Sequence, residues 1–443
     1  MADPTQQIDQ EQLREWLSQQ RWYASKSREL TGIELLEEAE LGSGLVLAFA
    51  QARFATGTHD IYQLSLGFDD GEVAFDALAE PAHARTLLTQ LEGGADLPTA
   101  EGRLSFRNTG NVPRLGDAED VHPVGKEQTN SSIVFGDELV LKVFRKLEPG
   151  INPELEMLRF LTARGYPHIA ALQGWYEYEG PSLSATLGVA QEFIPDAVDG
   201  WTLALNEIPS DPERFLQRVA ELGAATAELH NVLATAADDP AFSAEEPSVE
   251  SISLLRATID EEIEQIFLRL PESDERLVPI VGRGPEVRER LALRSRTGVG
   301  GKHIRIHGDF HLGQTLNSPR GWVILDFEGE PARPLTERRR KRSPLRDVAS
   351  ILRSFAYATS AVSLQRGLPV PPDFEQRARQ RFLETYFTNV DRGLLPPSDA
   401  AIESMLGIYE LEKAIYELGY ELDNRPDWVQ IPVAGIVRLL EQE

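Results

Sequence analysis

The chain has 443 residues, of which 41% are hydrophobic and 26% are charged, as in an ordinary folded protein. Lys and Arg number 44 and Asp and Glu number 71, so the formal net charge is −27. Nucleic acid and anionic membrane surfaces repel such a chain, which argues against both as partners. Cysteine is absent, which excludes disulfides and thiolate chemistry. Because no apolar run nears the ~20 residues of a membrane span and no signal-peptide core is present, we expect a cytoplasmic enzyme.

Residues 1–95 are predicted to form a small α+β cap. Residues 9–20 place apolar side chains on one face of a helix. Alternating hydrophobicity indicates strands at 33–36, 45–50, 61–66 and 72–75. A further helix is predicted over 81–91 and begins at Pro81. Glycines and a proline in residues 92–100 indicate a boundary after this cap.

Residues 96–197 are predicted to form a β-rich lobe, and residues 198–443 a helical lobe. In the first of these, the runs 131–135 and 138–144 are joined by Gly136-Asp137, which predicts a tight hairpin. A helix follows at 152–164. The sequence therefore predicts an α+β fold with a cap and two lobes, and its chemistry is expected between the lobes.

The strongest chemical pattern is His307-Gly308-Asp309 with Gln314, followed by Asp326-Phe327-Glu328. Phosphoryl transfer to a hydroxyl needs an acceptor for the proton and oxygen ligands for Mg²⁺ beside it. Protein kinases supply these groups as H-R-D-x-x-x-x-N followed by D-F-G. Asp309 and Gln314 have the same offset. We therefore predict Asp309 as the catalytic base and Gln314 and Asp326 as ligands of Mg²⁺ (or Mn²⁺); the alternative is a structural turn.

A lysine in the hairpin is a candidate to bind ATP. In the predicted strand 139–144, Lys142 lies between apolar neighbours, and burying that cation is costly unless an anion meets it. A nucleotide phosphate would meet it, and an acid on the next helix would hold it. Glu154 and Glu156 compete for that role, and Glu156 is included in the predicted ATP site. An edge-strand lysine that hinders aggregation is the alternative.

Two further segments are predicted to contact ATP. Small polar groups before the hairpin suit phosphate oxygens, although a plain polar turn fits equally well; they are Gln128, Thr129, Asn130, Ser131 and Ser132. An apolar strand that ends at Pro195 suits the hinge of a two-lobed kinase, whose backbone binds adenine, or else is an ordinary buried strand. Its candidate residues are Gln191, Glu192, Phe193 and Ile194.

Aromatic and charged side chains near the C-terminus suit a sugar, which presents apolar ring faces and hydroxyl edges. On the predicted helix 398–422 they recur at helical spacing; a helix packed by tyrosines is the alternative. The predicted substrate residues are Arg305, His311, Glu328, Tyr409, Glu412, Lys413, Tyr416, Glu417, Tyr420 and Trp428.

Three other features receive structural interpretations. The basic run 338–342 is interpreted as a solvated loop face, with an anion-binding patch as the alternative. Asp347, at a helix start, either anchors the catalytic loop through hydrogen bonds or caps its helix. His307 is assigned a structural role in the same loop.

Several stretches of the sequence resemble those of the aminoglycoside-phosphotransferase-like kinases and, within that family, of the actinobacterial maltokinases. The similar stretches span nearly the whole chain; they are 21–24, 127–142, 307–314, 326–331, 343–348 and 425–428. The resemblance implies a bilobal eukaryotic-protein-kinase-like fold with an N-terminal cap. It also implies transfer of the ATP γ-phosphoryl to O1 of maltose, which yields maltose 1-phosphate for α-glucan and glycogen synthesis alongside trehalose synthase. Gln314 replaces the usual Asn, and Glu328 replaces the glycine of D-F-G as a possible further acid at the metal.

Two alternative functions remain open. The acceptor could be another sugar or aminosugar, such as glucosamine, glucose or an aminoglycoside. The chain could also be a non-catalytic nucleotide-binding scaffold. Lys142, Asp309, Gln314 and Asp326 are all present, which argues against a scaffold, because degenerate kinases tend to lose one of these groups.

Overall fold

The computed structural model describes residues 8–23, 25–69, 72–74, 76–110, 112, 120–124, 130–235, 238–271, 273–295, 300–331 and 333–441. The chain divides into two compact units. The first unit comprises Met1–Ala163 and Ala170–Pro195, and the second comprises Arg164–Ile169 and Asp196–Glu443.

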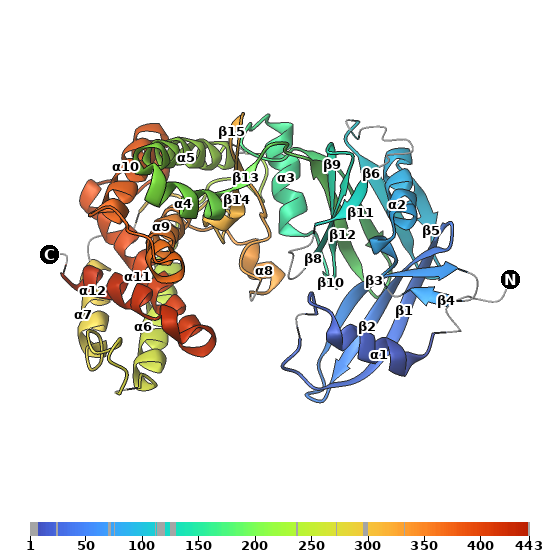
Figure 1. The fold of residues 1–443 in the computed structure, drawn as a ribbon, viewed down its shortest axis with the longest axis horizontal. Helices are drawn as coiled ribbons and strands as arrows, with labels where there is room; N and C mark the ends of the chain where they lie inside the picture. The colour runs from blue at the N-terminus through green and yellow to red at the C-terminus, as the bar shows by residue number, and fades with distance from the viewer. Residues whose placement is uncertain are drawn as a thin grey trace. The chain divides into compact units, whose positions relative to one another are not determined.

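The described residues of the first unit form two antiparallel sheets (Figure 1). One has the order β1-β2-β3-β10, with β4 paired to β3, and the other has the order β5-β6-β11-β12-β9-β8-β7. The strands of the first sheet are β1 (Leu30–Gly42), β2 (Leu45–Phe54), β3 (His59–Asp69), β4 (Glu72–Ala74) and β10 (Lys146–Leu147). Those of the second are β5 (Asp96–Pro98), β6 (Arg103–Asn108), β7 (Val121–Pro123), β8 (Asn130–Phe135), β9 (Leu139–Phe144), β11 (Leu172–Glu179) and β12 (Ser184–Glu192).

The helices described in this unit are α1 (Gln10–Gln19), α2 (Pro81–Gly93) and α3 (Pro153–Ala163), with a 3₁₀ turn at Ala77–Ala79. The helix α1 buries Leu13 and Leu17 in a core with Tyr62 of β3. Residues of the predicted cap and lobe also share buried contacts. The amide of Gln63 donates to the backbone oxygens of Phe144 and Leu187, so both sheets belong to one compact unit.

The predicted hairpin is present as β8 and β9. Gly136 and Asp137 have φ values of 55° and 52°, the positive values that a type I′ turn requires at both central positions. Ser132 pairs with Lys142 in the register, so Ser132 is a strand residue. Asn130, Ser131 and Ser132 therefore lie in a strand and not in a polar turn, as the predicted run 131–135 implies for the two serines, and their contact with ATP phosphates stays a prediction; Gln128 and Thr129 lie outside the described residues.

The second unit is mostly helical. Its helices are α4 (Gly200–Ser210), α5 (Pro212–Leu233), α6 (Val249–Leu268), α7 (Gly284–Arg294), α8 (Leu335–Arg338), α9 (Leu345–Arg366), α10 (Phe374–Asn389), α11 (Asp399–Asn424) and α12 (Gln430–Glu441). A small sheet has the order β13 (Val198–Asp199), β14 (Thr315–Ser318) and β15 (Gly321–Ile324). Short 3₁₀ turns lie at Leu312–Gln314, Arg392–Leu394 and Pro426–Trp428. The long helices α9 and α11 pack side by side, and the small sheet carries the loops of the candidate site (Figure 1).

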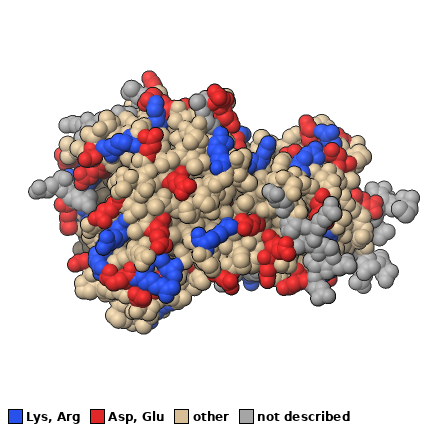
Figure 2. Space-filling view, turned by 90° about the horizontal axis from the view of Figure 1, so that it is seen from above, with Lys and Arg blue, Asp and Glu red and all other residues tan. Residues whose placement is uncertain are grey.

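On the face drawn in Figure 2, basic side chains lie among acidic ones. On the described part of that face the positive charge is therefore not gathered into one continuous patch of the kind that binds nucleic acid. Among the described residues, no helix has the length and apolar character needed to cross a bilayer.

Candidate active site

A buried aspartate holds the predicted catalytic loop in place. Ile304 exchanges backbone hydrogen bonds with Arg342, and the chain then turns at Gly308, whose φ is +85°. The backbone N–H groups of His307 and Gly308 donate to Asp347 Oδ2 and Oδ1, at 2.8 and 3.0 Å. Asp347 lies in the first turn of α9 and is 1% exposed. Its side chain therefore anchors the loop, which was one of the two alternatives for this residue.

His307 connects this loop to the segment that follows β15. Its Nε2 lies 2.8 Å from the backbone oxygen of Leu325. Its ring packs against Phe310 and Phe327, with centroid distances of 5.4 and 5.0 Å. The side chain is 1% exposed, so its surroundings are those of a structural group.

Asp309 is held in its ionised form. Lys413 Nζ lies 3.9 Å from Asp309 Oδ1, and His311 Nε2 lies 3.8 Å from Oδ2. Burial by itself would raise the pKa of Asp309, but the nearby His311 ring and the charge of Lys413 outweigh burial and lower it to about 2. At neutral pH the side chain is thus a carboxylate that can accept a hydrogen bond from an acceptor hydroxyl.

The predicted metal ligands also lie together. Gln314 Nε2 donates to Asp326 Oδ2 at 2.8 Å. Asp326 adopts a φ of +60°, a left-handed conformation that is costly for a non-glycine residue and is often found at functional sites. Carboxylate oxygens of Asp326 and Glu328 lie within 4.8 Å of each other. Two carboxylates and an amide oxygen suit Mg²⁺, so Glu328 fits the metal group better than the predicted substrate group.

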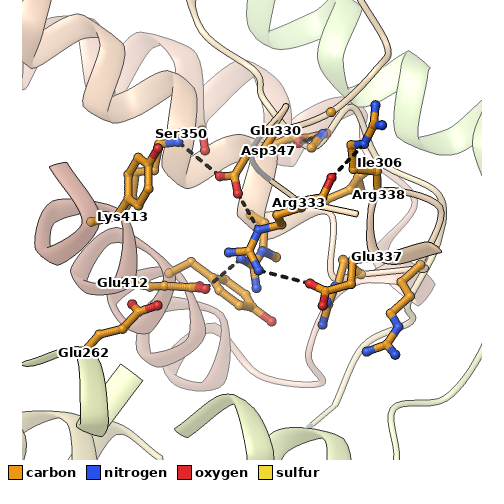
Figure 3. A pocket seen from close by; sticks show the side chains of 17 residues that line it. Glu262, Ile306, Glu330, Arg333, Glu337, Arg338, Asp347, Ser350, Glu412 and Lys413 are labelled. Atoms are coloured by element: carbon orange, nitrogen blue, oxygen red, sulfur yellow. Dashed lines mark hydrogen bonds and ion pairs between the residues drawn. The ribbon is translucent and has the colours of Figure 1, made fainter. Parts of the chain in front are cut away.

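A pocket in the second unit adjoins these loops (Figure 3). Its wall combines acidic, basic and aromatic side chains with backbone of the catalytic loop. The lining residues are Glu262, Ile306, Gly308, Gly329, Glu330, Arg333, Glu337, Arg338, Arg340, Arg342, Arg346, Asp347, Ser350, Tyr409, Glu412, Lys413 and Tyr416. The predicted substrate residues Tyr409, Glu412, Lys413 and Tyr416 therefore share one pocket.

Ion pairs organise this pocket. Glu330 accepts from Lys413 at 3.4 Å and from Arg333 at 2.5 Å. Arg346 pairs with Glu412 at 2.7 Å. Burial would raise the pKa of Glu330, yet Lys413 and Arg333 lower it, so this carboxylate is ionised next to Asp309. The pocket thus presents fixed charges to a polar ligand.

The basic run 338–342 is not the solvated loop face that was predicted. The side chain of Arg338 is 5% exposed and its Nη1 donates to the backbone oxygen of Glu328 at 3.2 Å. Arg340 and Arg342 line the pocket with it. Part of the run therefore lines the pocket, and within it Lys341 pairs with Glu245, which is distant in sequence.

Four other predicted substrate residues are placed elsewhere. Arg305 is 2% exposed and packs over the ring of Phe242 at 5.4 Å, a position in the core. Glu417 forms a buried ion pair with Arg353 at 2.6 Å. Tyr420 and Trp428 gather around Arg425, at 5.4 and 4.8 Å. The structure does not support a sugar contact by these four residues, whereas His311 contacts Asp309 and lies outside the described lining of the pocket.

Replacing Glu417 by Gln is expected to lower the free energy of unfolding by about 2 kcal/mol, because Arg353 loses a charged hydrogen-bond partner in the core. The KM for the sugar should change less than twofold. Urea unfolding and steady-state kinetics measure the two quantities. A large rise in the KM for the sugar without a loss of stability would show that Glu417 contacts the sugar.

In the first unit, Lys142 pairs with Glu154. The Nζ–Oε2 distance is 2.7 Å, and Glu154 is 1% exposed. Gln191 Nε2 donates to the other oxygen of Glu154 at 3.0 Å. The inclusion of Glu156 in place of Glu154 in the predicted ATP site is therefore corrected.

The predicted hinge forms the end of β12 and the residues after it. The N–H groups of Glu192 and Phe193 donate to the backbone oxygens of Ala171 and Glu138. These two donors are used inside the unit, so any adenine contact would use other backbone groups of the segment. Ile194 is 7% exposed.

Sequence reasoning missed several residues of the pocket. Glu330 follows Asp326 closely, and its motif could have indicated it. Arg346 lies inside the stretch 343–348 that resembles the kinase family and Arg333 follows the stretch 326–331, but neither has a distinctive spacing. Glu262 lies on α6, far from every motif, and no sequence signal indicated it.

Two family profiles match the chain. Residues 16–95 match the maltokinase N-terminal cap domain, and residues 120–355, more than half of the chain, match the phosphotransferase enzyme family. A curated protein named glucosamine kinase from Mycolicibacterium smegmatis is 28% identical over 347 residues, 73% of this chain and 81% of that protein. Another of that name from Streptacidiphilus jiangxiensis is 26% identical over 348 residues, 75% of this chain and 76% of that protein.

Solved structures agree with these matches. A glucosamine kinase has a TM-score of 0.76 at 20% identity and covers 100% of this chain and 98% of its own. A glucosamine kinase in complex with glucosamine, ADP and inorganic phosphate has a TM-score of 0.73 at 20% identity, with coverages of 96% and 99%. The predicted kinase-like α+β fold with an N-terminal cap is confirmed. The chain therefore belongs to the phosphotransferase enzyme family and carries a maltokinase-type cap domain.

Proposed function

We propose that this protein transfers the γ-phosphoryl group of ATP to a sugar, and that the sugar is maltose, phosphorylated at O1. The main support for phosphotransfer is the ionised carboxylate of Asp309, which lies beside a pocket of charged and aromatic side chains. The match of residues 16–95 to the maltokinase cap supports maltose. The product would be maltose 1-phosphate for α-glucan synthesis in the cytoplasm, with trehalose synthase as a possible partner.

In the proposed reaction, Asp309 orients the acceptor hydroxyl and accepts its proton late, because the transition state is largely dissociative. The bond from the γ-phosphorus to the bridging oxygen of ADP breaks as the bond to the sugar oxygen forms. Lys142 is proposed to contact phosphate oxygens of ATP. No covalent phospho-enzyme is expected.

The fit of a divalent cation rests on the chemistry of its donors. Gln314, Asp326 and Glu328 offer the oxygen ligands that Mg²⁺ prefers. When bound, the ion would neutralise charge on the phosphates. Arg338 bonds to the backbone of Glu328 and positions that loop.

Glucosamine is the second candidate acceptor, because both curated relatives described above are named glucosamine kinase. Their identities of 28% and 26% support the reaction class more strongly than the substrate. A non-catalytic scaffold is the third candidate.

A substrate screen tests the proposal. The protein is mixed with ATP, Mg²⁺ and maltose, glucosamine, glucose or kanamycin, and ADP release is measured. Phosphorus NMR then reports the position of the phosphate on the product. We expect turnover with maltose and an anomeric phosphate. Turnover with glucosamine alone would overturn maltose, and ATP binding without turnover on any sugar would support the scaffold.

A further inference from the structure

Two charged side chains in the wall of the pocket have no role in the proposed chemistry. Glu262 comes from α6, and Arg342 comes from the basic run. Most neighbouring charges are paired: Arg346 with Glu412, and Glu330 with Lys413. Within the described ranges, neither the Glu262 carboxylate nor the Arg342 guanidinium has a hydrogen bond or an ion pair.

Both groups are partly withdrawn from water. Burial raises the pKa of Glu262, and the nearby charge of Glu412 raises it further. Figure 3 shows these two carboxylates on the same side of the pocket. Burial lowers the pKa of Arg342, and the charge of Arg346 lowers it further. Each charged form is therefore less stable here than in water, because partly buried charges need partners.

The two groups require opposite kinds of partner. A carboxylate needs hydrogen-bond donors, and a guanidinium needs acceptors. A hydroxyl group supplies both, so one polyhydroxylated ligand can satisfy both side chains. An ammonium group could satisfy only Glu262, and it would enter a wall that also carries Arg333, Arg340 and Arg342.

We propose that Glu262 and Arg342 bind hydroxyl groups of the acceptor and make the pocket select a neutral sugar over an amino sugar. This inference rests on the proposed function and names the acceptor class for the same site. Both residues are expected to determine ground-state affinity, because neither contacts Asp309 among the described interactions. Their loss should therefore change KM and leave kcat in place.

The variants Glu262→Gln and Arg342→Gln test the proposal, with Glu264→Gln as the matched control. Glu264 lies on the same helix, and its side chain is 56% exposed. Each variant should raise the Kd and the KM for a neutral sugar about tenfold, the effect of losing one hydrogen bond to a charged group. The kcat and the KM for ATP should stay within about twofold, and the control should match the wild type.

Two further measurements separate the possible failures. Arg342→Gln should lower the ratio of kcat/KM for maltose to that for glucosamine by about tenfold. Calorimetry of maltose binding without ATP reports affinity independently of turnover. Weakened maltose binding in both variants would uphold the inference even if the wild type phosphorylated no sugar. Unchanged binding and an unchanged ratio, in variants that unfold in urea like the wild type, would overturn it while the phosphotransfer proposal stands.

Discussion

Replacing Asp309 by Asn is expected to reduce kcat by about 10²–10⁴-fold, the usual contribution of a general base. The amide keeps the shape of the side chain but cannot accept the proton of the acceptor hydroxyl. Lys413 and His311 would lose their anionic partner and keep their places around the loop. ATP affinity should be retained, because the proposed phosphate contact, Lys142, is a different residue.

The measurement is steady-state kinetics with the sugar that the wild type uses best, together with calorimetric titration of ATP. Asp399→Asn is the matched control, since this aspartate belongs to the same unit and its side chain is 98% exposed. If the variant kept a kcat within about tenfold of the wild type, the loss would be smaller than the contribution of a general base. Asp309 would then not be the base.

The pH profile gives a second test of Asp309. Its pKa of about 2 means that the carboxylate is already ionised well below neutral pH. Above about pH 4, the protonated fraction of such a group is about 1% or less. An acid limb of kcat between pH 5 and 7 would therefore belong to another group, and its persistence in Asp309→Asn would show this directly.

Local patterns predicted that Gln314 and Asp326 lie together, because short-range geometry determines their positions. The offset between Asp309 and Gln314 is fixed by one tight loop, and Gly136-Asp137 determines the turn of the hairpin. Asp326 follows the end of β15 after one residue, Leu325, which places its carboxylate next to Gln314. These contacts join residues that are close in sequence, so the local backbone conformation is enough to bring them together.

The remaining errors concern which face of a helix points toward the site. Glu154 and Glu156 point in different directions on α3, but only tertiary packing decides which direction meets Lys142. Lys413 and Glu417 are one helical turn apart on α11, yet Glu417 meets Arg353 of α9 and Lys413 meets Asp309. Helical spacing gives the relative directions of side chains and not their partners.

The basic run was misjudged for a related reason. Like-charged neighbours usually separate in water, which favours a solvated loop. Lys341 instead pairs with Glu245, and Arg338 donates to the backbone oxygen of Glu328. Glu245 lies 96 positions from Lys341 in the sequence, and such a separation hides the pair.

Replacing Asp347 by Ala is expected to lower the free energy of unfolding by about 4 kcal/mol. The carboxylate accepts from the N–H groups of His307 and Gly308 and lies 3.2 Å from His230 Nε2. Alanine would leave these buried donors without a partner, since the site is shielded from water. Asp347→Asn should have a smaller effect because its amide oxygen still accepts one of the bonds.

The pH dependence of stability distinguishes this anchor from a general packing defect. Burial would raise the pKa of Asp347, but His230 and the loop N–H groups hold it below its ordinary value of 3.8. A carboxyl whose folded-state pKa is lowered adds stability above its unfolded pKa and loses that stability as the pH falls through the folded value. The difference in the free energy of unfolding between the wild type and Asp347→Asn should therefore have its full value at pH 6 and should shrink below about pH 4.

Urea unfolding at several pH values measures this difference. Asp373→Asn serves as the control, because Asp373 precedes α10, makes no side-chain capping bond and should change stability by less than about 0.5 kcal/mol. If Asp347→Ala unfolds at the same urea concentration as the wild type, the catalytic loop is held by other contacts. The position of Asp309 would then depend on the other contacts of its loop with the segment after β15, those of His307 with the Leu325 backbone and of Gln314 with Asp326.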